Sequence, residues 1–154
     1  IIIEPDPRLR QPSRLLKPEE VLSKDFQELL DRLSWTMKKN NGVGIAAPQI
    51  GLNLRAVIVD IDHKETCLLN PEIIKSSTAL AQSEEGCLSV PGMYGIVMRH
   101  KRVTVRALNR HGRRVQMEYK NFASFVVQHE IDHLDGILFI DKAIKMTNTN
   151  ARHF

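Results

Sequence analysis

The sequence has few of the features that mark exported or membrane proteins. It contains only two cysteines, Cys67 and Cys87, among 154 residues, too few for a disulfide framework. The N-terminus lacks the charged region, apolar stretch and cleavage site of a secretory signal. No apolar run approaches the roughly 18 residues of a membrane helix. We therefore expect a cytoplasmic protein that has no membrane partner.

A basic surface for nucleic acid is also missing. The formal net charge is +4, but the basic residues are dispersed in short clusters at 38–39, 100–102 and 110–114. Such clusters are typical of solvated turns, so we expect no specific nucleic-acid partner. With 42% hydrophobic residues, residues 1–154 are long enough for a single domain with its own core.

One stretch has the spacing of a metal site, namely His129-Glu130-Ile131-Asp132-His133. Histidines four residues apart lie on one face of a helix, so both imidazoles can bind the same ion. Glu130 lies between them, where its carboxylate can act as a general base on water at that ion. The alternative is a buried amphipathic helix with two core histidines, which leaves the position of Glu130 unexplained.

The third metal ligand is expected upstream of this stretch. A catalytic site normally has three protein ligands and an open position. No Glu follows Glu130, and Phe139 stands where a third histidine of the extended pattern would fall. Cys87 is the better candidate because residues 84–92 around it are polar and contain glycine. The alternative, Cys67, precedes two leucines and is more typical of a buried structural thiol.

The hydrophobic pattern predicts strands in the middle of the chain and helices near both ends. Apolar residues at helical spacing predict a helix from about Ser23 to Lys39. Strands are expected at 54–60, 67–69, 72–75, 103–107 and 115–119. The last two strands, separated by a turn at 109–112, predict a hairpin. The expected fold class is α+β, with antiparallel β-sheets packed around a central metal-binding helix.

A glycine-rich segment, Gly42-Val43-Gly44-Ile45-Ala46-Ala47-Pro48-Gln49, needs a separate explanation. Its start matches the G-x-G-x-x-A of dinucleotide sites. However, it follows a predicted helix and precedes a predicted strand, which reverses the context of that motif. The better interpretation is a backbone-exposing loop or edge strand that another chain can approach, with Gln49 as a neutral amide donor at its end.

Three segments together carry a resemblance to a known family. They are GVGIAAPQ at 42–49, EGCLS at 85–89 and QHEIDH at 128–133. In their order and spacing they resemble the peptide deformylases, whose pattern is G-x-G-x-A-A-x-Q, E-G-C-L-S and Q-H-E-x-D-H. Members of this family remove the formyl group from nascent N-formylmethionyl chains. The similarity extends to about Asp141, so we expect a catalytic core at 1–141 and a short tail at 142–154.

The resemblance implies a role for each residue of the site. The metal ligands would be Cys87, His129 and His133. This ligand set suits zinc, iron, cobalt or nickel, and the resemblance favours ferrous iron as the native ion. Glu130 would transfer the proton. The amide of Gln49 and the backbone N–H of Leu88 would stabilise the oxyanion.

The resemblance also implies how the substrate binds. The peptide would lie as an added strand, paired with the backbones of Val43 and Gly86 beside Gly44. Its methionine side chain would enter an apolar pocket, for which the matching positions are Val43, Phe122, Phe125 and Val126. Ordinary core packing is the alternative for these four residues. Glu85 is expected to pair with Arg99 and brace the metal loop, or else to be held by other donors.

Partners and location follow from the same resemblance. N-formylmethionyl nascent peptides occur in bacteria and in organelles of bacterial origin. The bacterial cytoplasm is the expected location, and an organelle is the alternative. Transient ribosome association is a further partnership that the resemblance allows, although not through a long C-terminal helix, because the sequence ends soon after Lys142. Two other functions compete: a metallopeptidase that cuts ordinary peptide bonds, and a structural metal-binding module, which would need neither Glu130 nor Gln49.

Overall fold

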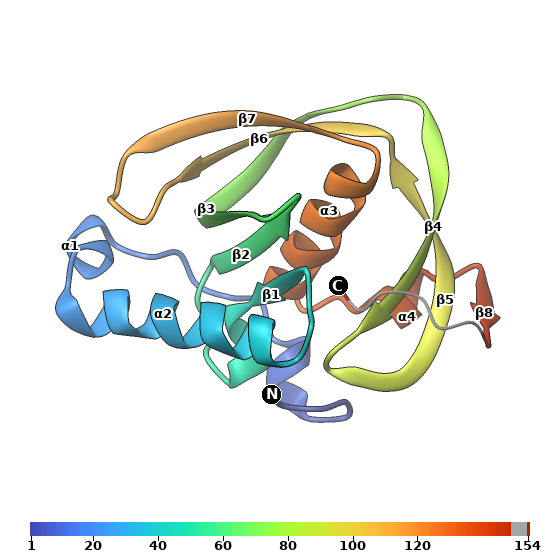
Figure 1. Ribbon diagram of the computed structural model, residues 1–154, viewed down its shortest axis with the longest axis horizontal. Helices are drawn as coiled ribbons and strands as arrows, with labels where there is room; N and C mark the ends of the chain where they lie inside the picture. Colours follow the sequence, from blue (N-terminus) through green and yellow to red (C-terminus); the bar gives the residue numbers. More distant parts are fainter. Residues whose placement is uncertain (149–153) are drawn as a thin grey trace.

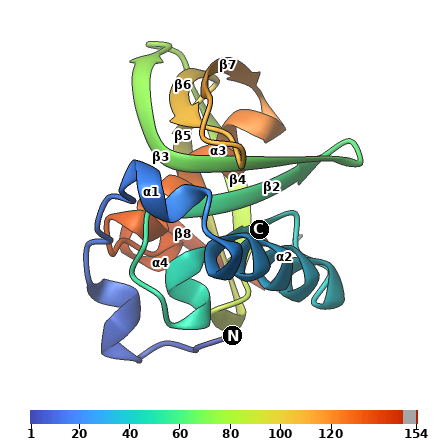
Figure 2. The same ribbon diagram turned by 90° about the vertical axis from the view of Figure 1, so that its left-hand side faces the viewer.

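The computed structural model describes residues 1–148 and residue 154 (Figures 1 and 2). The helical segments are η1 (Pro7–Arg10), α1 (Pro18–Val21), α2 (Lys24–Lys39), η2 (Ala47–Ile50), α3 (Phe122–Leu134) and α4 (Phe139–Lys142). The strands are β1 (Gly44–Ala46), β2 (Ala56–Ile61), β3 (Lys64–Ser76), β4 (Leu80–Cys87), β5 (Val90–His100), β6 (Arg102–Leu108), β7 (Arg114–Lys120) and β8 (Lys145–Thr147). Residues 149–153 of the predicted tail lie outside the described residues, and the division into a core of 1–141 and a tail of 142–154 stays a prediction.

The strands form two antiparallel sheets on either side of one helix. The larger sheet has the order β1-β2-β3-β6-β7, and the smaller has the order β4-β5-β8. Figure 1 shows α3 at the centre of the molecule, between the two sheets. The predicted α+β class, with antiparallel sheets around a central helix, is confirmed. In the described part of the chain, no helix has the length and apolar character needed to cross a membrane.

The strand β2 is covered by a helix on each face. Val57 and Val59 belong to the core cluster beneath α3, whereas Ile58 packs with Leu33 and Met37 of α2. Successive side chains of a strand point to opposite faces, so a strand covered on both sides must be apolar at every position. This double burial explains the uninterrupted apolar run in β2, and it places the larger sheet firmly against the helix of the candidate site.

The predicted helix and hairpin are confirmed. Ser23 caps α2, and its Oγ accepts a hydrogen bond from the N–H of Phe26. The strands β6 and β7 form the expected hairpin, with Ala107 opposite Val115. The strand β3 continues beyond Pro71 with irregular pairing, as expected where a residue without an N–H interrupts a ladder.

The hairpin of β4 and β5 was not predicted. Its buried positions include Ser83, Glu85 and Arg99, so the inward face does not alternate between apolar and polar residues. The opposite charges of Glu85 and Arg99 pair with each other, so these two polar side chains can be buried. A pattern based on hydrophobicity therefore misses this strand pair, although Cys87 lies at its end.

The helix α3 is buried on nearly every side and is held at its middle and just beyond its C-terminal end. At the middle, the amide of Gln128 donates to the carbonyl of His100 and its oxygen accepts from the N–H of the same residue. Beyond the C-terminal end, Gly136 has a φ of +73°, and a Cβ built there would lie 2.5 Å from the carbonyl oxygen of Arg10. The helix that carries the two histidines therefore ends at Leu134, just before a glycine in the left-handed region.

Replacing Gly136 with alanine should destabilise the fold by more than the cost of its left-handed backbone conformation alone. Gly92 is a matched control because its φ is +76° and a Cβ there would meet nothing within 4 Å. We expect Gly92→Ala to lower the free energy of unfolding by about 1–2 kcal/mol, the cost of a left-handed residue. Gly136→Ala should cost clearly more, because the Arg10 backbone must also move. Urea unfolding measures both, and equal costs would show that the contact with Arg10 does not constrain the helix end.

Candidate metal and active site

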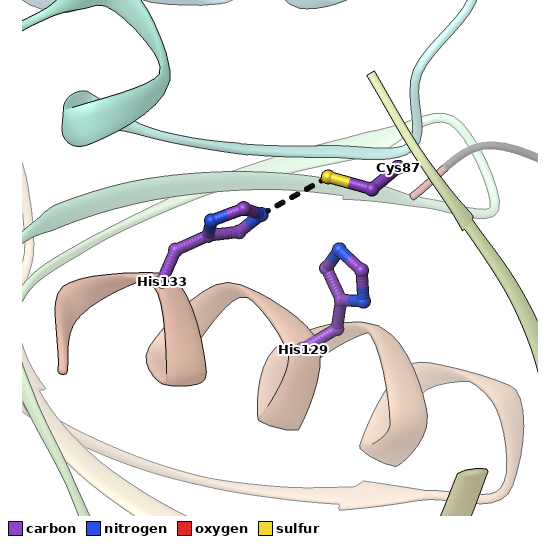
Figure 3. Close-up of side chains that lie close together, drawn as sticks. All are labelled: Cys87, His129 and His133. Atoms are coloured by element: carbon purple, nitrogen blue, oxygen red, sulfur yellow. Dashed lines mark hydrogen bonds between the residues drawn. The ribbon is translucent and has the colours of Figure 1, made fainter. Parts of the chain in front are cut away.

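Three potential metal ligands converge at the end of β4. Figure 3 shows that His129 and His133 project from α3 toward Cys87. The Sγ of Cys87 lies 3.3 Å from Nε2 of His133, and the ligand atoms of all three residues lie within 4.8 Å of one another. Cys67 is elsewhere, on β3 opposite Ile58. The structure thus brings the favoured cysteine, and not its alternative, to the paired histidines.

The chemistry of these side chains fits a metal ion. The Nε2 atom of His129 is buried and has no hydrogen-bond partner among the described residues. Sulfur and nitrogen ligands of a tetrahedral ion lie about 3.5 Å apart, given bond lengths of roughly 2.3 and 2.0–2.1 Å. The observed spacing of Cys87 and His133 is close to this separation. A thiolate and two imidazoles are suitable ligands for zinc or iron, and they leave a position open.

Glu85 sets the orientation of the first histidine. Its Oε2 lies 2.8 Å from Nδ1 of His129. A carboxylate that accepts the Nδ1 proton leaves Nε2 as the nitrogen with a free lone pair, as second-sphere partners of metal ligands commonly do. Glu85 can hold this role because Arg99 donates to both of its oxygens, at 2.8 and 2.9 Å, which confirms the expected pairing.

Arg99 also connects the smaller sheet to α3. A further nitrogen of its guanidinium donates to Asp132 at 2.6 Å, and Lys142 donates to the same carboxylate. Burial disfavours the ionised form of Glu85, but the hydrogen bonds from Arg99 and His129 outweigh it and lower the pKa of Glu85 to about 2. The carboxylate is therefore ionised throughout the neutral range, as its bond to His129 requires.

Burial disfavours the charged forms of three further ionisable groups of the site, Glu130, Cys87 and His133. Burial raises the pKa of the Glu130 carboxyl well above 4.5, and the Glu85 carboxylate adds to this effect. Burial also raises the pKa of the Cys87 thiol, with a further contribution from Glu130. For His133, burial lowers the pKa, and the neighbouring His129 lowers it further. A cation would reverse this balance by favouring the carboxylate and the thiolate.

A glycine makes room for Glu130. A Cβ built on Gly44 would lie 2.8 Å from both Cγ and Cδ of Glu130, closer than any side chain tolerates. Both carboxyl oxygens of Glu130 are buried and lack a hydrogen-bond partner among the described residues. An unpartnered buried acid is costly to stability and is typical of a group that acts on a ligand.

Gln49 directs its amide N–H groups to the site. Its Oε1 accepts a hydrogen bond from the N–H of Ala46 at 2.9 Å, which fixes the oxygen because a backbone N–H needs an acceptor. The Nε2 group therefore faces Cys87, at 3.6 Å from Sγ, and Ser89, at 3.2 Å from Oγ. Leu88, the other expected oxyanion donor, lies between these two residues in the turn that joins β4 to β5.

Three of the predicted pocket residues lie in or against one core cluster. Val126 is fully buried in the core cluster, and Val43 and Phe125 pack against that cluster. Phe122 is 37% exposed at the start of α3. The carbonyl of Val43 is engaged by the N–H of Asp60, so it is not free to pair with a peptide.

Comparison with known proteins identifies the family. Residues 1–149 match the family model of polypeptide deformylase. The chain belongs to the peptide deformylase family. The peptide deformylase of Carboxydothermus hydrogenoformans is 45% identical over 138 residues, which cover 90% of this chain and 88% of the relative. That of Pseudothermotoga lettingae is 46% identical, with 88% of this chain and 77% of the relative covered.

Solved deformylases share the fold. The K1U-bound crystal structure of the class I type b enzyme from Acinetobacter baumannii has a TM-score of 0.90 at 36% identity, covering 92% of this chain and 97% of that one. The enzyme from Thermotoga maritima has a TM-score of 0.88 at 35% identity, with 93% and 95% covered. The chain is therefore a hydrolase that removes the N-formyl group from newly made polypeptides. Metal dependence is general in this family, and Cys87, His129 and His133 form a group that could hold the ion.

Sequence reasoning missed several residues around the deformylase site. Ser89 contacts Gln49, and Asp132 binds Arg99. Ser89 lies inside the EGCLS motif and Asp132 inside the QHEIDH motif. Their place in these motifs could have marked them as site residues. Phe154 packs against His129 although no pattern marks it. This contact joins two residues far apart in the sequence, which local spacing does not show.

Removing Arg99 should cost the deformylase much of its stability. Arg99→Met keeps the length of the side chain but leaves Glu85 as a buried, unpaired charge. We expect a loss of about 3–5 kcal/mol in the free energy of unfolding at pH 7. Arg106→Met is the matched control, because Arg106 and Glu72 are 58% and 64% exposed, and such pairs contribute at most about 1 kcal/mol.

The pH dependence of this stability gives a second readout. Because the folded pKa of Glu85 is lowered from 4.5 to about 2, its contribution is complete above pH 4.5 and is lost as the pH falls toward 2. The difference between the wild type and Arg99→Met should therefore shrink over that window in urea unfolding. Equal losses for Arg99→Met and Arg106→Met would refute the central role of the buried network.

Proposed function

We propose that Cys87, His129 and His133 hold one divalent ion, ferrous iron in the native enzyme, for deformylation of N-formylmethionyl peptides. The single observation that carries the proposal is the convergence of one thiol and two imidazoles from β4 and α3 within 4.8 Å. Zinc, nickel and cobalt suit the same ligands. Two unpartnered features, the Nε2 of His129 and the carboxyl of Glu130, support an ion and a reacting group at this position.

Glu130 is proposed as the proton-transfer group. When bound, the ion supplies Lewis acidity, which polarises the formyl carbonyl and lowers the pKa of water at the site toward neutrality. Glu130 accepts a proton from the water as it attacks the formyl carbon, and then delivers that proton to the departing amine. The C–N bond of the formamide breaks, and the products are formate and a free N-terminus. A buried carboxyl beside a cation can exist in either protonation state, as both steps require.

Gln49 and the N–H of Leu88 are proposed to stabilise the oxyanion of the tetrahedral intermediate. The orientation of Gln49 is fixed by its bond to Ala46, so its Nε2 donates without rearrangement. The N-terminal segment supports both loops, because the N–H of Ile2 donates to the carbonyl of Gln49 and that of Glu4 donates to Ser89. A preorganised neutral donor stabilises developing negative charge without leaving a charge in the resting site.

The peptide is proposed to bind as a strand between Gly44 and Gly86. The carbonyl of Val43 accepts from Asp60 on the β2 side, and backbone groups of an antiparallel strand alternate in direction. Gly44 therefore directs its groups to the open edge of β1, and Val43 contributes mainly its side chain. The methionine pocket comprises Val43, Phe122, Phe125 and Val126. In support, the Acinetobacter baumannii enzyme, at 34% identity and a TM-score of 0.90, has been solved with Met-Ala-Ser bound.

We also propose a bacterial cytoplasmic location, with an organelle of bacterial origin as the alternative, and transient association with the ribosome. The relatives named above come from bacteria. Formylated nascent chains are made on ribosomes, so an enzyme that acts on them must reach the place where they emerge. Co-sedimentation with translating ribosomes at physiological salt tests the association.

Substituting the two cysteines should separate their roles. Cys87→Ser replaces a thiolate with a poor neutral ligand, so the affinity for the ion should fall by more than the roughly 10–100-fold typical of losing a second-sphere partner. Cys67→Ser, on β3, should keep one ion per chain. Elemental analysis of anaerobically purified proteins gives the metal content, and iron in the wild type is the expected result. Loss of metal from Cys67→Ser would overturn the ligand assignment.

Glu130→Gln should greatly lower activity without loss of metal. Formate release from formyl-Met-Ala-Ser should fall by about 10²–10⁴-fold, typical of losing a general acid–base group. Because burial raises the folded pKa of Glu130, its neutral form is favoured and stability is lost as the pH rises above 4.5. The metal-free variant should therefore be more stable at neutral pH, by about 0.5–2 kcal/mol.

Glu118 of β7, which is 44% exposed, offers the control for this test. Glu118→Gln removes an equal charge and should change neither formate release nor stability at neutral pH. Metal content, formate release and thermal unfolding are measured on all proteins. Near-normal formate release by Glu130→Gln would exclude the proton-transfer role. Cleavage of an internal bond of the same peptide by the wild type would instead favour a peptidase.

A further inference from the structure

Phe154 lies in the region proposed for the substrate. Its side chain is 2% exposed and belongs to the core cluster that contains Val126, against which Val43 and Phe125 pack. Its ring meets Phe122 edge-on, with centroids 5.4 Å apart. Phe154 therefore contacts or shares a cluster with all four residues of the proposed methionine pocket.

The backbone of Phe154 makes a contact proposed for the peptide. Its N–H donates to the carbonyl of Gly86 at 3.1 Å. Gly86 belongs to β4, which is the edge strand of the smaller sheet. The carbonyl through which a substrate strand would pair with β4 is thus occupied by a residue of the same chain.

The ring of Phe154 also reaches the candidate metal site. It meets the imidazole of His129 edge-on, with centroids 5.2 Å apart. A core phenylalanine would only fill space, whereas this residue combines an apolar side-chain contact with a backbone hydrogen bond to a strand edge. That combination is how a peptide is recognised by strand addition. Figure 1 marks the C-terminus between β1 and β4, in agreement with these contacts.

We propose that Phe154 is an intrachain occupant of the methionine pocket, which a formylated peptide must displace before it can react. The inference rests on the proposed function, because it takes Gly86 and the four pocket residues as the substrate site. One pocket cannot hold two large side chains, so binding of Phe154 and binding of substrate exclude each other. In this view Phe154 itself sets how readily the enzyme accepts a peptide, and the pocket admits an aromatic ring as well as a methionine side chain.

Kinetics of the metal-loaded full chain test this competition. Phe154→Ala should lower KM for formyl-Met-Ala-Ser and leave kcat unchanged, since the occupant is absent from the reacting complex. If Phe154 fills the pocket nine-tenths of the time, KM falls by about tenfold. Phe154→Leu keeps a large apolar side chain and should retain most of the high KM. The control Ile144→Ala removes a 63% exposed side chain and should leave both constants unchanged.

Phe122→Ala separates failure of this proposal from failure of the proposed function. A raised KM in Phe122→Ala supports the pocket. If KM in Phe154→Ala is then unchanged or higher, Phe154 is a structural wall and the competition is refuted. An unchanged KM in Phe122→Ala would overturn the pocket itself, and the competition with it.

Binding of the product gives a readout that a structural role would not move. In holoenzyme labelled with ¹⁵N-phenylalanine, the Phe154 amide should lose its hydrogen bond to Gly86 as Met-Ala-Ser is added. Its NMR signal should then change in proportion to the fraction of enzyme bound. A Phe154 signal that stays unchanged at saturating peptide would overturn the proposal, whatever the kinetic result.

Discussion

The structure depends on one buried ionic network, in which Arg99 of β5 joins acids on two other elements. Its guanidinium donates to both oxygens of Glu85 on β4 and to Asp132 on α3. Arg99 and Glu85 are 2% and 0% exposed, and buried charges are tolerated only when they are paired and fully hydrogen-bonded. Each charge is neutralised only when β4, β5 and α3 meet in one register. The network therefore specifies where the smaller sheet packs on the helix, and through Glu85 it also orients His129.

The burial that makes this network necessary also determines the chemistry of the site. Burial raises the pKa of both Glu130 and Cys87. A positive ion beside them would favour their charged forms, so metal binding and loss of protons are coupled. A fold optimised for stability alone would not leave the two oxygens of Glu130 without partners. That cost is expected at a site that acts on a ligand.

Much of the fold was predictable where local patterns decide it. The helical spacing of apolar residues predicted α2, and alternation predicted the hairpin of β6 and β7. Local patterns failed for β4 and β5, because the inward residues include Glu85 and Arg99, whose burial depends on each other. The spacing of His129 and His133 predicted their common helix face. By contrast, the contact of Glu85 with His129 joins residues 44 positions apart, and no local pattern carries that information.

The site itself lies where two sheets end in open edges. The strand β1 is one edge of the larger sheet and β4 is one edge of the smaller one. An unpaired edge exposes backbone groups that can pair with any extended chain, which is normally a hazard. Pairing through the backbone at such an edge is tolerant of sequence. In the proposed binding mode, such pairing suits an enzyme that acts on newly made polypeptides of many sequences, and only the first side chain would be selected by a pocket. The same tolerance allows a residue of the chain itself, Phe154, to pair with Gly86, so the features proposed for peptide binding also leave the edge open to an internal occupant.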